Sequence, residues 1–417
     1  MFCVACSPSA AQQIPFSDIL RTALEDLRVV QNRDNLSQVR QLKFQVPLIR
    51  RAEARIGFNG STLGDTIYGS IRNEDFYGVV VGPNSFRERR KQAAFHAATI
   101  AQYETERSML VSAAVSERYQ TYTQWYFARK LRVEQEKLAE LLQKEVSLWQ
   151  ERLARGMEVK ISDLLQTERD QYNLLLQIQE NGNTERLNSA KLGQYDPAFG
   201  ARLPDTSQII APAVLEKQLM LLKNAPLEAP SVALRDAQWR TAQAEYAVEN
   251  AQNRQIFNFL QVGYDDPVLP LTRPNRRRTF NNFSLRVAVE VPIAGNNNPR
   301  RAKAALDLLQ ADNNRHLTRQ VYEKNAALQV VELENLMAAQ GICIQQMENS
   351  LARRLLKDTS LQSKMTTEEW ISAQILLQRR IIQCLDAQKQ TVLSYLRLIE
   401  TKGWMAREPL QNFFRME

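Results

Sequence analysis

The stretch that decides the fold runs from Arg87 to Arg155 and reads RERRKQAAFHAATIAQYETERSMLVSAAVSERYQTYTQWYFARKLRVEQEKLAELLQKEVSLWQERLAR. It contains neither proline nor glycine over its 69 residues, and at about 1.5 Å per residue one helix of this length extends roughly 100 Å. Apolar residues in its second half recur at steps of seven, four, seven and four, which is the heptad spacing of a coiled-coil seam. These positions are Leu131, Leu138, Leu142, Trp149 and Leu153.

The helical pattern breaks at Gly156 and then resumes, which predicts a helical hairpin. Residues 161–176 carry the same apolar spacing after the break. The second half of the chain has matching seams over 337–355 and 371–396, on either side of a second break near Met365. We therefore expect two antiparallel coiled-coil hairpins.

The chain also contains an internal repeat. Residues 54–58 read ARIGF and have a counterpart in residues 260–264, which read LQVGY. Each half reads helix, strand, loop, strand, long helix, tight turn, long helix. We expect the first repeat over 12–205 and the second over 206–417. Proline and glycine cluster in 191–230, which predicts a segment of mixed structure between the two patterns.

The strands of each repeat are amphipathic. Residues 283–291 read FSLRVAVEV, with an apolar residue at every second position and Arg286 and Glu290 among the positions between them. Residues 53–58 alternate in the same way. A half-buried strand of a soluble protein would also alternate, but the chain offers only about four such strands and no adjoining helix with a spare apolar face. A transmembrane barrel needs about eight strands, so a barrel built from this chain requires an oligomer.

Composition and motifs exclude several classes of protein. The chain has 417 residues with 44% hydrophobic and 24% charged residues, and no apolar run is long enough for a spanning helix. The net charge is +8, but the basic residues alternate with acids along helices, which disfavours nucleic-acid binding. We find no phosphate-binding loop, zinc-protease motif or nucleophile elbow, and the two histidines, His96 and His316, lie on predicted helices. We therefore expect no catalytic site, cofactor or metal.

The N-terminus and the cysteines leave alternatives open. Residues 1–11 resemble the end of a signal peptide with cleavage before Gln12, while acylation of Cys6 is a weaker alternative. A helix is expected from about Ser17 to Val46. Cys343 and Cys384 fall at similar depths of the second hairpin. A disulfide between them is possible in an oxidising compartment, but helix axes about 8–10 Å apart often hold Cα atoms beyond bonding reach, so the sequence leaves the bond open.

Taken in order, these features resemble the TolC-like family of bacterial outer-membrane channels. The resemblance rests on the tandem repeat, the basic helix starts at 86–90 and 299–303, the first hairpin end from Gly156 to Leu165, and the mid-chain segment 187–197. It implies a homotrimer in which the helices form a periplasmic tunnel and the strands form a 12-stranded barrel in the outer membrane. It also implies a passive conduit for efflux or type I secretion that works with a periplasmic adaptor protein and an inner-membrane transporter.

The resemblance assigns roles to particular residues. The hairpin ends, where the family contacts its adaptor, fall on Gly156, Met157 and Glu158 and on Lys364, Met365 and Thr366, where the second end lacks the family's glycine. The periplasmic gate falls nearest to Asp163, with Glu368 and Glu369 as substitute acids.

The loops that join the strands, 59–75 and 265–281, are expected outside the cell. Four arginines in the second loop would face anionic lipid there: Arg273, Arg276, Arg277 and Arg278. The alternative interpretation of the whole chain is a periplasmic coiled-coil scaffold without a pore. The strands discriminate the two, because a scaffold gains nothing from an apolar face that points outward.

Overall fold

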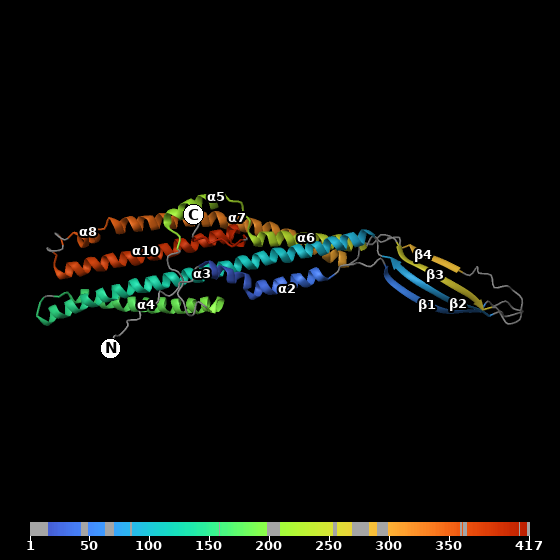
Figure 1. Ribbon diagram of the computed structural model, residues 1–417, viewed down its shortest axis with the longest axis horizontal. Helices are drawn as coiled ribbons and strands as arrows, with labels where there is room; N and C mark the ends of the chain where they lie inside the picture. Colours follow the sequence, from blue (N-terminus) through green and yellow to red (C-terminus); the bar gives the residue numbers. More distant parts are fainter. Residues whose placement is uncertain are drawn as a thin grey trace, which may run out of the picture. The chain divides into compact units, whose positions relative to one another are not determined.

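The computed structural model describes most of the chain (Figure 1). The described residues are 16–42, 49–62, 71–83, 86–157, 159–197, 209–252, 257–268, 283–289, 299–358, 361, 365–407 and 409–414. The expected signal peptide remnant, Glu158, Lys364 and the four loop arginines lie outside these ranges.

Long helices dominate the structure, as the sequence predicts. The helices are α1 Phe16–Arg21, α2 Leu27–Gln41, α3 Phe86–Ala154, α4 Ile161–Tyr195, α5 Pro212–Asn224, α6 Pro230–Gln252, α7 Pro299–Glu348, α8 Leu351–Lys357 and α10 Thr367–Lys402, with short 3-10 helices η1 Thr22–Glu25 and η3 Trp404–Ala406. The strands are β1 Ile49–Thr62, β2 Ile71–Pro83, β3 Phe257–Val268 and β4 Phe283–Val289. Within the described ranges, none of the helices combines the length and apolar character that crossing a membrane requires.

Two predicted helices are interrupted. The N-terminal helix breaks at Asp26, whose extended backbone separates η1 from α2, and whose carboxylate accepts hydrogen bonds from Arg28, which hold its pKa at about 2. The seam over 337–355 is divided because α7 ends at Glu348 and α8 begins after Ser350. The Ser350 hydroxyl accepts a hydrogen bond from the backbone N–H of Arg353. A serine side chain that satisfies the backbone in this way favours a helix start over a continued helix.

Three of the strands, β1, β2 and β3, are longer than predicted, whereas β4 covers 283–289 of the predicted 283–291. β1 extends to Thr62, β2 begins at Ile71 and β3 extends to Val268, so the expected loops 59–75 and 265–281 are too wide by several residues. The extra residues pair across the sheet, for example Thr62 with Ile71 and Asn73 with Val268. Their backbone hydrogen bonds override the low strand propensity of the glycine, asparagine and acidic residues there.

The chain divides into two compact units. The first contains residues 1–34, 106–233 and 318–417, and the second contains residues 35–105 and 234–317. The helices α2, α3, α6 and α7 contribute residues to both units.

The first unit is organised by an aromatic core. Phe16 of α1 contacts Tyr119 and Tyr122 of α3, and Phe414 packs against all three rings. The hydroxyl of Tyr119 donates to the carbonyl of Gln411 at 3.0 Å and accepts from the N–H of Phe413 at 2.8 Å. These contacts hold the C-terminal segment in the core. A second apolar cluster joins α3, α4 and α10: Leu138, Leu142, Leu174, Ile371 and Ile375.

The end of α10 has a strict requirement for glycine. Gly403 caps this helix with φ of 83°, in the left-handed region. A Cβ atom at this position would overlap the carbonyl group of Glu228, whose N–H donates to the carbonyl of Lys402 at 3.1 Å. Backbone strain and steric overlap therefore act together at one residue.

Gly403→Ala is expected to lower the free energy of unfolding by about 3 kcal/mol, the sum of a left-handed alanine and a forced backbone shift. Thermal unfolding followed by circular dichroism measures the effect. Gly193→Ala is the matched control, because an added Cβ there meets nothing within 4 Å and alanine favours a helix interior. Equal unfolding temperatures for the two variants would contradict the prediction.

The second unit contains a single four-stranded antiparallel sheet among its described residues, in the order β1-β2-β3-β4 (Figure 1). The helical part of this unit is tied by polar contacts. His96 of α3 bonds to the carbonyl of Val39, and Arg315 of α7 lies over the ring of Trp239 on α6 at 4.2 Å.

Candidate functional site: the sheet and the hairpin ends

One face of the sheet is apolar and uncovered. Ala54 of β1, Val79 of β2, Val262 of β3 and Leu285 of β4 lie opposite one another in register. All four are exposed, with fractional exposures of 51%, 45% and 68% for Val79, Val262 and Leu285. Such exposure shows that no described segment of the chain packs on this face.

The neighbouring row on the same face has the same character. Leu260 lies opposite Val287 and is 40% exposed, while Val287 is 50% exposed. On the other side of the first row, Ile56 of β1, two residues after Ala54, is 65% exposed. Side chains two residues apart on a strand share a face, so the apolar surface crosses all four strands.

The opposite face is different. Arg55 of β1 pairs with Glu53 at 3.3 Å, and both alternate with the apolar residues of that strand. Val80 of β2, which lies opposite Glu53, is 3% exposed, and Gly263 of β3 is also buried. The sheet therefore has its charged pair on one face and its exposed apolar residues on the other.

The first hairpin ends in a glycine turn. Gly156 has φ of 70°, and the N–H of Met157 donates to the carbonyl of Arg152 at 3.0 Å. This places glycine in the left-handed region that the reversal needs, as the sequence predicts. Gly156 and Met157 are both exposed, so this end is available to a partner.

The second hairpin end is built differently. Thr366 and Glu369 form a capping box, in which the Thr366 hydroxyl accepts from the N–H of Glu369 and the Glu369 carboxylate accepts from the N–H of Thr366. Backbone and hydroxyl hydrogen bonds from Thr366 lower the pKa of the Glu369 carboxyl. A capping box therefore starts α10 where the family has glycine.

The three candidate gate acids have different roles in the structure. Asp163 lies in the exposed first turn of α4, where its carboxylate accepts from the Ser162 hydroxyl. Glu369 is engaged in the capping box. Glu368 of the second hairpin forms an ion pair with Arg152 of α3, in the first hairpin, at 2.5 Å. Among the described ion pairs, neither of the other two acids makes such a link between the hairpins.

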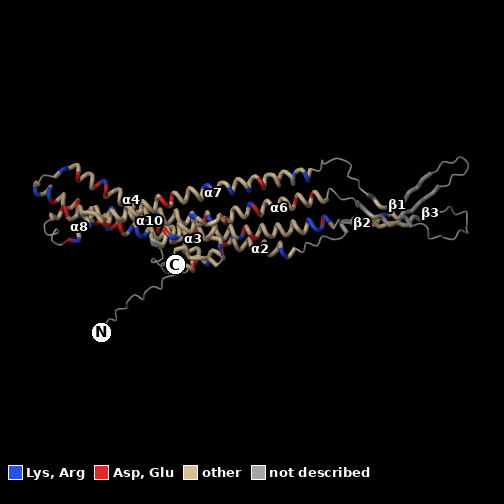
Figure 2. Tube along the Cα trace, turned by 90° about the horizontal axis from the view of Figure 1, so that it is seen from above, with Lys and Arg blue, Asp and Glu red and all other residues tan. Residues whose placement is uncertain are grey.

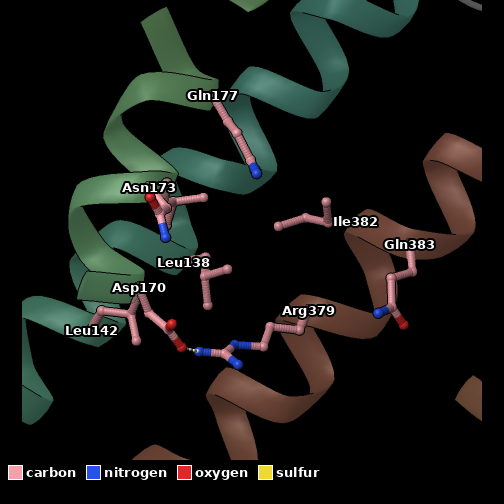
Figure 3. Close-up of a pocket in the computed structure, with 9 residues that line it drawn as sticks. Leu138, Leu142, Asp170, Asn173, Gln177, Arg379, Ile382 and Gln383 are labelled. Atoms are coloured by element: carbon pink, nitrogen blue, oxygen red, sulfur yellow. Dashed lines mark hydrogen bonds and ion pairs between the residues drawn. The ribbon is translucent and has the colours of Figure 1, made fainter. Parts of the chain in front are cut away.

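A second inter-hairpin ion pair was not predicted. Arg379 of α10 reaches Asp170 of α4 at 2.5 Å (Figure 3). The pair borders a groove of about 420 Å³ that Leu138, Leu142 and Ile382 also line. The signal in the sequence is the position of Arg379 between two seam isoleucines, Ile375 and Ile382, since charges that flank a coiled-coil seam often pair between helices.

Cys343 of α7 and Cys384 of α10 are joined by a disulfide, with their Cα atoms 5.6 Å apart. The structure thus resolves the alternative that the sequence leaves open. Among the described residues, no group of histidine, cysteine or acidic side chains is arranged to hold a metal ion.

No family model and no curated protein matches the sequence. Solved structures do match. The MtrE outer membrane channel of Neisseria gonorrhoeae, in its open state, has a TM-score of 0.62 at 12% identity, covering 93% of this chain and 88% of that chain. The outer membrane protein VceC of Vibrio cholerae has a TM-score of 0.57 at 13% identity, covering 93% and 96%.

The structure of CusC, described for its transmembrane channel formation, has a TM-score of 0.60 at 13% identity and covers 93% of this chain and 91% of that chain. The likeness therefore extends over nearly the whole chain in each of these proteins. At such identities it establishes the fold, which is the fold of bacterial outer-membrane channels, as the resemblance to the TolC-like family implies.

Proposed function

We propose that this chain is the outer-membrane duct of an efflux or type I secretion system, a passive conduit from the periplasm through the outer membrane, and not an enzyme. The uncovered apolar face of the sheet carries this proposal. Its exposed residues, such as Val262 and Leu285, lie in the same register on neighbouring strands. An exposed apolar face of this kind is stable in contact with lipid, provided that the backbone groups of its strands are hydrogen-bonded to one another.

The open edges of the sheet support a trimer. β1 and β4 are the outer strands of the described sheet, and an edge strand in lipid leaves its backbone groups without partners. Four strands are too few for a closed barrel, which needs about eight. Three copies joined edge to edge give a barrel of about twelve strands with no open edge.

Exposed seams on the helices also support an oligomer. Ile161, Leu165, Tyr172 and Leu176 follow heptad spacing along α4, yet their exposed fractions lie between 49% and 67%. A seam that is exposed in one chain gains stability when it packs against another helix. Neighbouring copies supply that helix in a tunnel wall.

The hairpin ends are the proposed contact with a periplasmic adaptor, which in turn would join an inner-membrane transporter. The exposed turn at Gly156 and Met157 supports this role. The capping box at Thr366 gives the second end a different chemistry, so we propose that the two ends contact the adaptor through different groups.

We further propose that two ion pairs hold the gate: Arg152 with Glu368, and Arg379 with Asp170. Both connect α10 to the first hairpin, so releasing them weakens the contact between the hairpins and leaves the apolar cluster around Leu138 to hold it. Asp163 has no such link in the described ion pairs, and Glu369 is committed to its cap. Of the three predicted acids, Glu368 is therefore the one that we assign to the gate, through its pair with Arg152.

Arg379→Ala is expected to raise the open probability of the reconstituted channel several-fold, because it removes the ion pair to Asp170. Single-channel recording measures the change. Arg380→Ala is the matched control: it removes the next cation of α10, which donates to the carbonyl of Gln346 at 3.0 Å on the same hairpin. The same open probability in both variants and in the unaltered chain would contradict this gate.

The proposed function itself is tested with the full chain extracted in mild detergent. A trimer by mass measurement and stepwise currents after insertion into a planar lipid bilayer are the expected results. The scaffold alternative predicts a freely water-soluble monomer or dimer without conductance, and that result would end the proposal.

A further inference from the structure

Both repeats place a basic run where the helix after the second strand begins. α3 starts with Phe86 and continues through Arg87, Arg89, Arg90 and Lys91. α7 starts with Pro299 and carries Arg300, Arg301 and Lys303. Figure 2 shows these basic residues gathered at the starts of the two helices.

Helix stability does not explain these charges. The N-terminal end of a helix carries partial positive charge, which favours acidic residues in its first turn and disfavours basic ones. The same unfavourable pattern stands at the start of both helices. A role outside the helix therefore accounts for it better than a role within it.

At the start of α3, the only acid of the basic run is buried, whereas several of its cations are exposed. Glu88 is 2% exposed and accepts hydrogen bonds at 3.1 Å from the side-chain amides of Gln92 and Gln252. Arg87 and Arg90 are exposed. The surface of this segment thus presents cations while its carboxylate is turned inward.

These cations surround a hollow. It has a volume of about 590 Å³ and is lined by Phe86, Arg87, Arg90 and Lys91. The ring of Phe86 is 81% exposed. Guanidinium groups bind phosphate through paired hydrogen bonds, and the apolar ring of Phe86 beside them suits contact with the acyl chains next to the headgroups.

The position along the chain identifies the partner. β2 ends at Pro83, shortly before the hollow, and carries the apolar face up to Val79 and Val81. If that face contacts lipid, as the proposed function requires, the start of α3 lies at the depth of the phospholipid headgroups. We propose that the starts of α3 and α7 bind the headgroups of anionic phospholipids in the leaflet on the helical side of the membrane.

This surface is distinct from the connecting loop 265–281, which the sequence predicts to face the outside of the cell. It extends the proposed function by giving the duct a preference for the lipid around it. Removing basic residues at a membrane surface weakens attraction to anionic lipid by a few-fold for each charge.

Native mass spectrometry of the full-length detergent-solubilised trimer provides the test. The probe is an equimolar mixture of phosphatidylglycerol and phosphatidylcholine with identical acyl chains. The unaltered protein is expected to retain phosphatidylglycerol several-fold over phosphatidylcholine. The triple variant Arg87→Gln, Arg90→Gln, Lys91→Gln is expected to lose most of that preference, and the cations at the start of α7 account for what remains.

The control is Arg169→Gln, Arg186→Gln, Lys191→Gln, which removes three exposed cations from α4. It is expected to retain the preference. Equal retention of the two lipids by the unaltered protein, or the same loss in both triple variants, would overturn the inference.

Planar-bilayer recording in pure phosphatidylcholine separates this inference from the proposed function. Conductance without any lipid preference rejects the headgroup surface alone. Absence of both trimer and conductance rejects the duct itself.

Discussion

Val262→Lys is expected to block stable insertion of the protein into the outer membrane. Val262 lies on β3, between Val79 and Leu285 in register, and its side chain belongs to the uncovered apolar face. A lysine on the lipid face of a barrel costs roughly 2–4 kcal/mol near the middle of the bilayer. The proposed trimer would contain the substitution three times, so the cost would act on each of its subunits.

Lysine substitutions at two adjacent positions on β1 compare the two faces of the sheet. Ala54→Lys introduces a cation on the apolar face, opposite Val79. Glu53→Lys introduces the same residue one position earlier, on the face that carries Arg55. Lysine at Ala54 is expected to lower the yield of membrane-inserted trimer strongly, while lysine at Glu53 leaves most of it.

Membrane fractionation followed by heat-modifiable mobility on gels measures the inserted trimer for all three variants. Equal yields for Ala54→Lys and Glu53→Lys would show that the face does not contact lipid. That result would rule out the proposed barrel, since the exposed apolar residues would need a protein partner.

Loss of the disulfide is expected to lower the free energy of unfolding by about 4 kcal/mol, which follows from closing a loop of 41 residues. Cys343 and Cys384 join α7 to α10, the two long helices of the second hairpin. Cross-linking removes conformations from the unfolded chain and leaves the folded hairpin in place. The double variant Cys343→Ala, Cys384→Ala, compared with the unaltered protein in thermal unfolding, measures the effect.

Reduction provides a second measurement. A reducing agent is expected to lower the unfolding temperature of the unaltered protein toward that of the double variant, and to leave the double variant unchanged. A thiol titration of the folded protein that finds Cys343 and Cys384 free would contradict the bond. An unfolding temperature that does not respond to reduction would show that the hairpin is held by its seam alone.

The two hairpin ends show how far a family pattern extends to a particular chain. Gly156 could be placed from the sequence because a reversal with positive φ selects glycine. The second end could not, because Thr366 and Glu369 solve the same problem through side-chain hydrogen bonds. Any Thr-x-x-Glu segment can form these hydrogen bonds, but it acts as a cap only where a helix begins directly after the threonine.

The contacts of the proposed gate could be predicted only in part from the sequence. Glu368 was predicted as an acid near the second end, and the structure supplies its partner, Arg152. Asp170 and Arg379 were missed, although they form the second link between the hairpins. Long-range ion pairs depend on which helix faces meet, and a single sequence does not fix that choice.

The sequence by itself determined the long helices, the amphipathic strands and the tandem repeat, because the absence of helix breakers and the periods of 3.5 and 2 act locally along the chain. The tertiary structure decided the breaks at Asp26 and Ser350, the reach of the strands, and the bond between Cys343 and Cys384. Each of these depends on atoms that are distant in sequence or on competition for the same backbone group. The strand pairing and the disulfide are set by how the elements pack, and the two breaks are set by side-chain hydrogen bonds that hydrophobic periodicity does not encode.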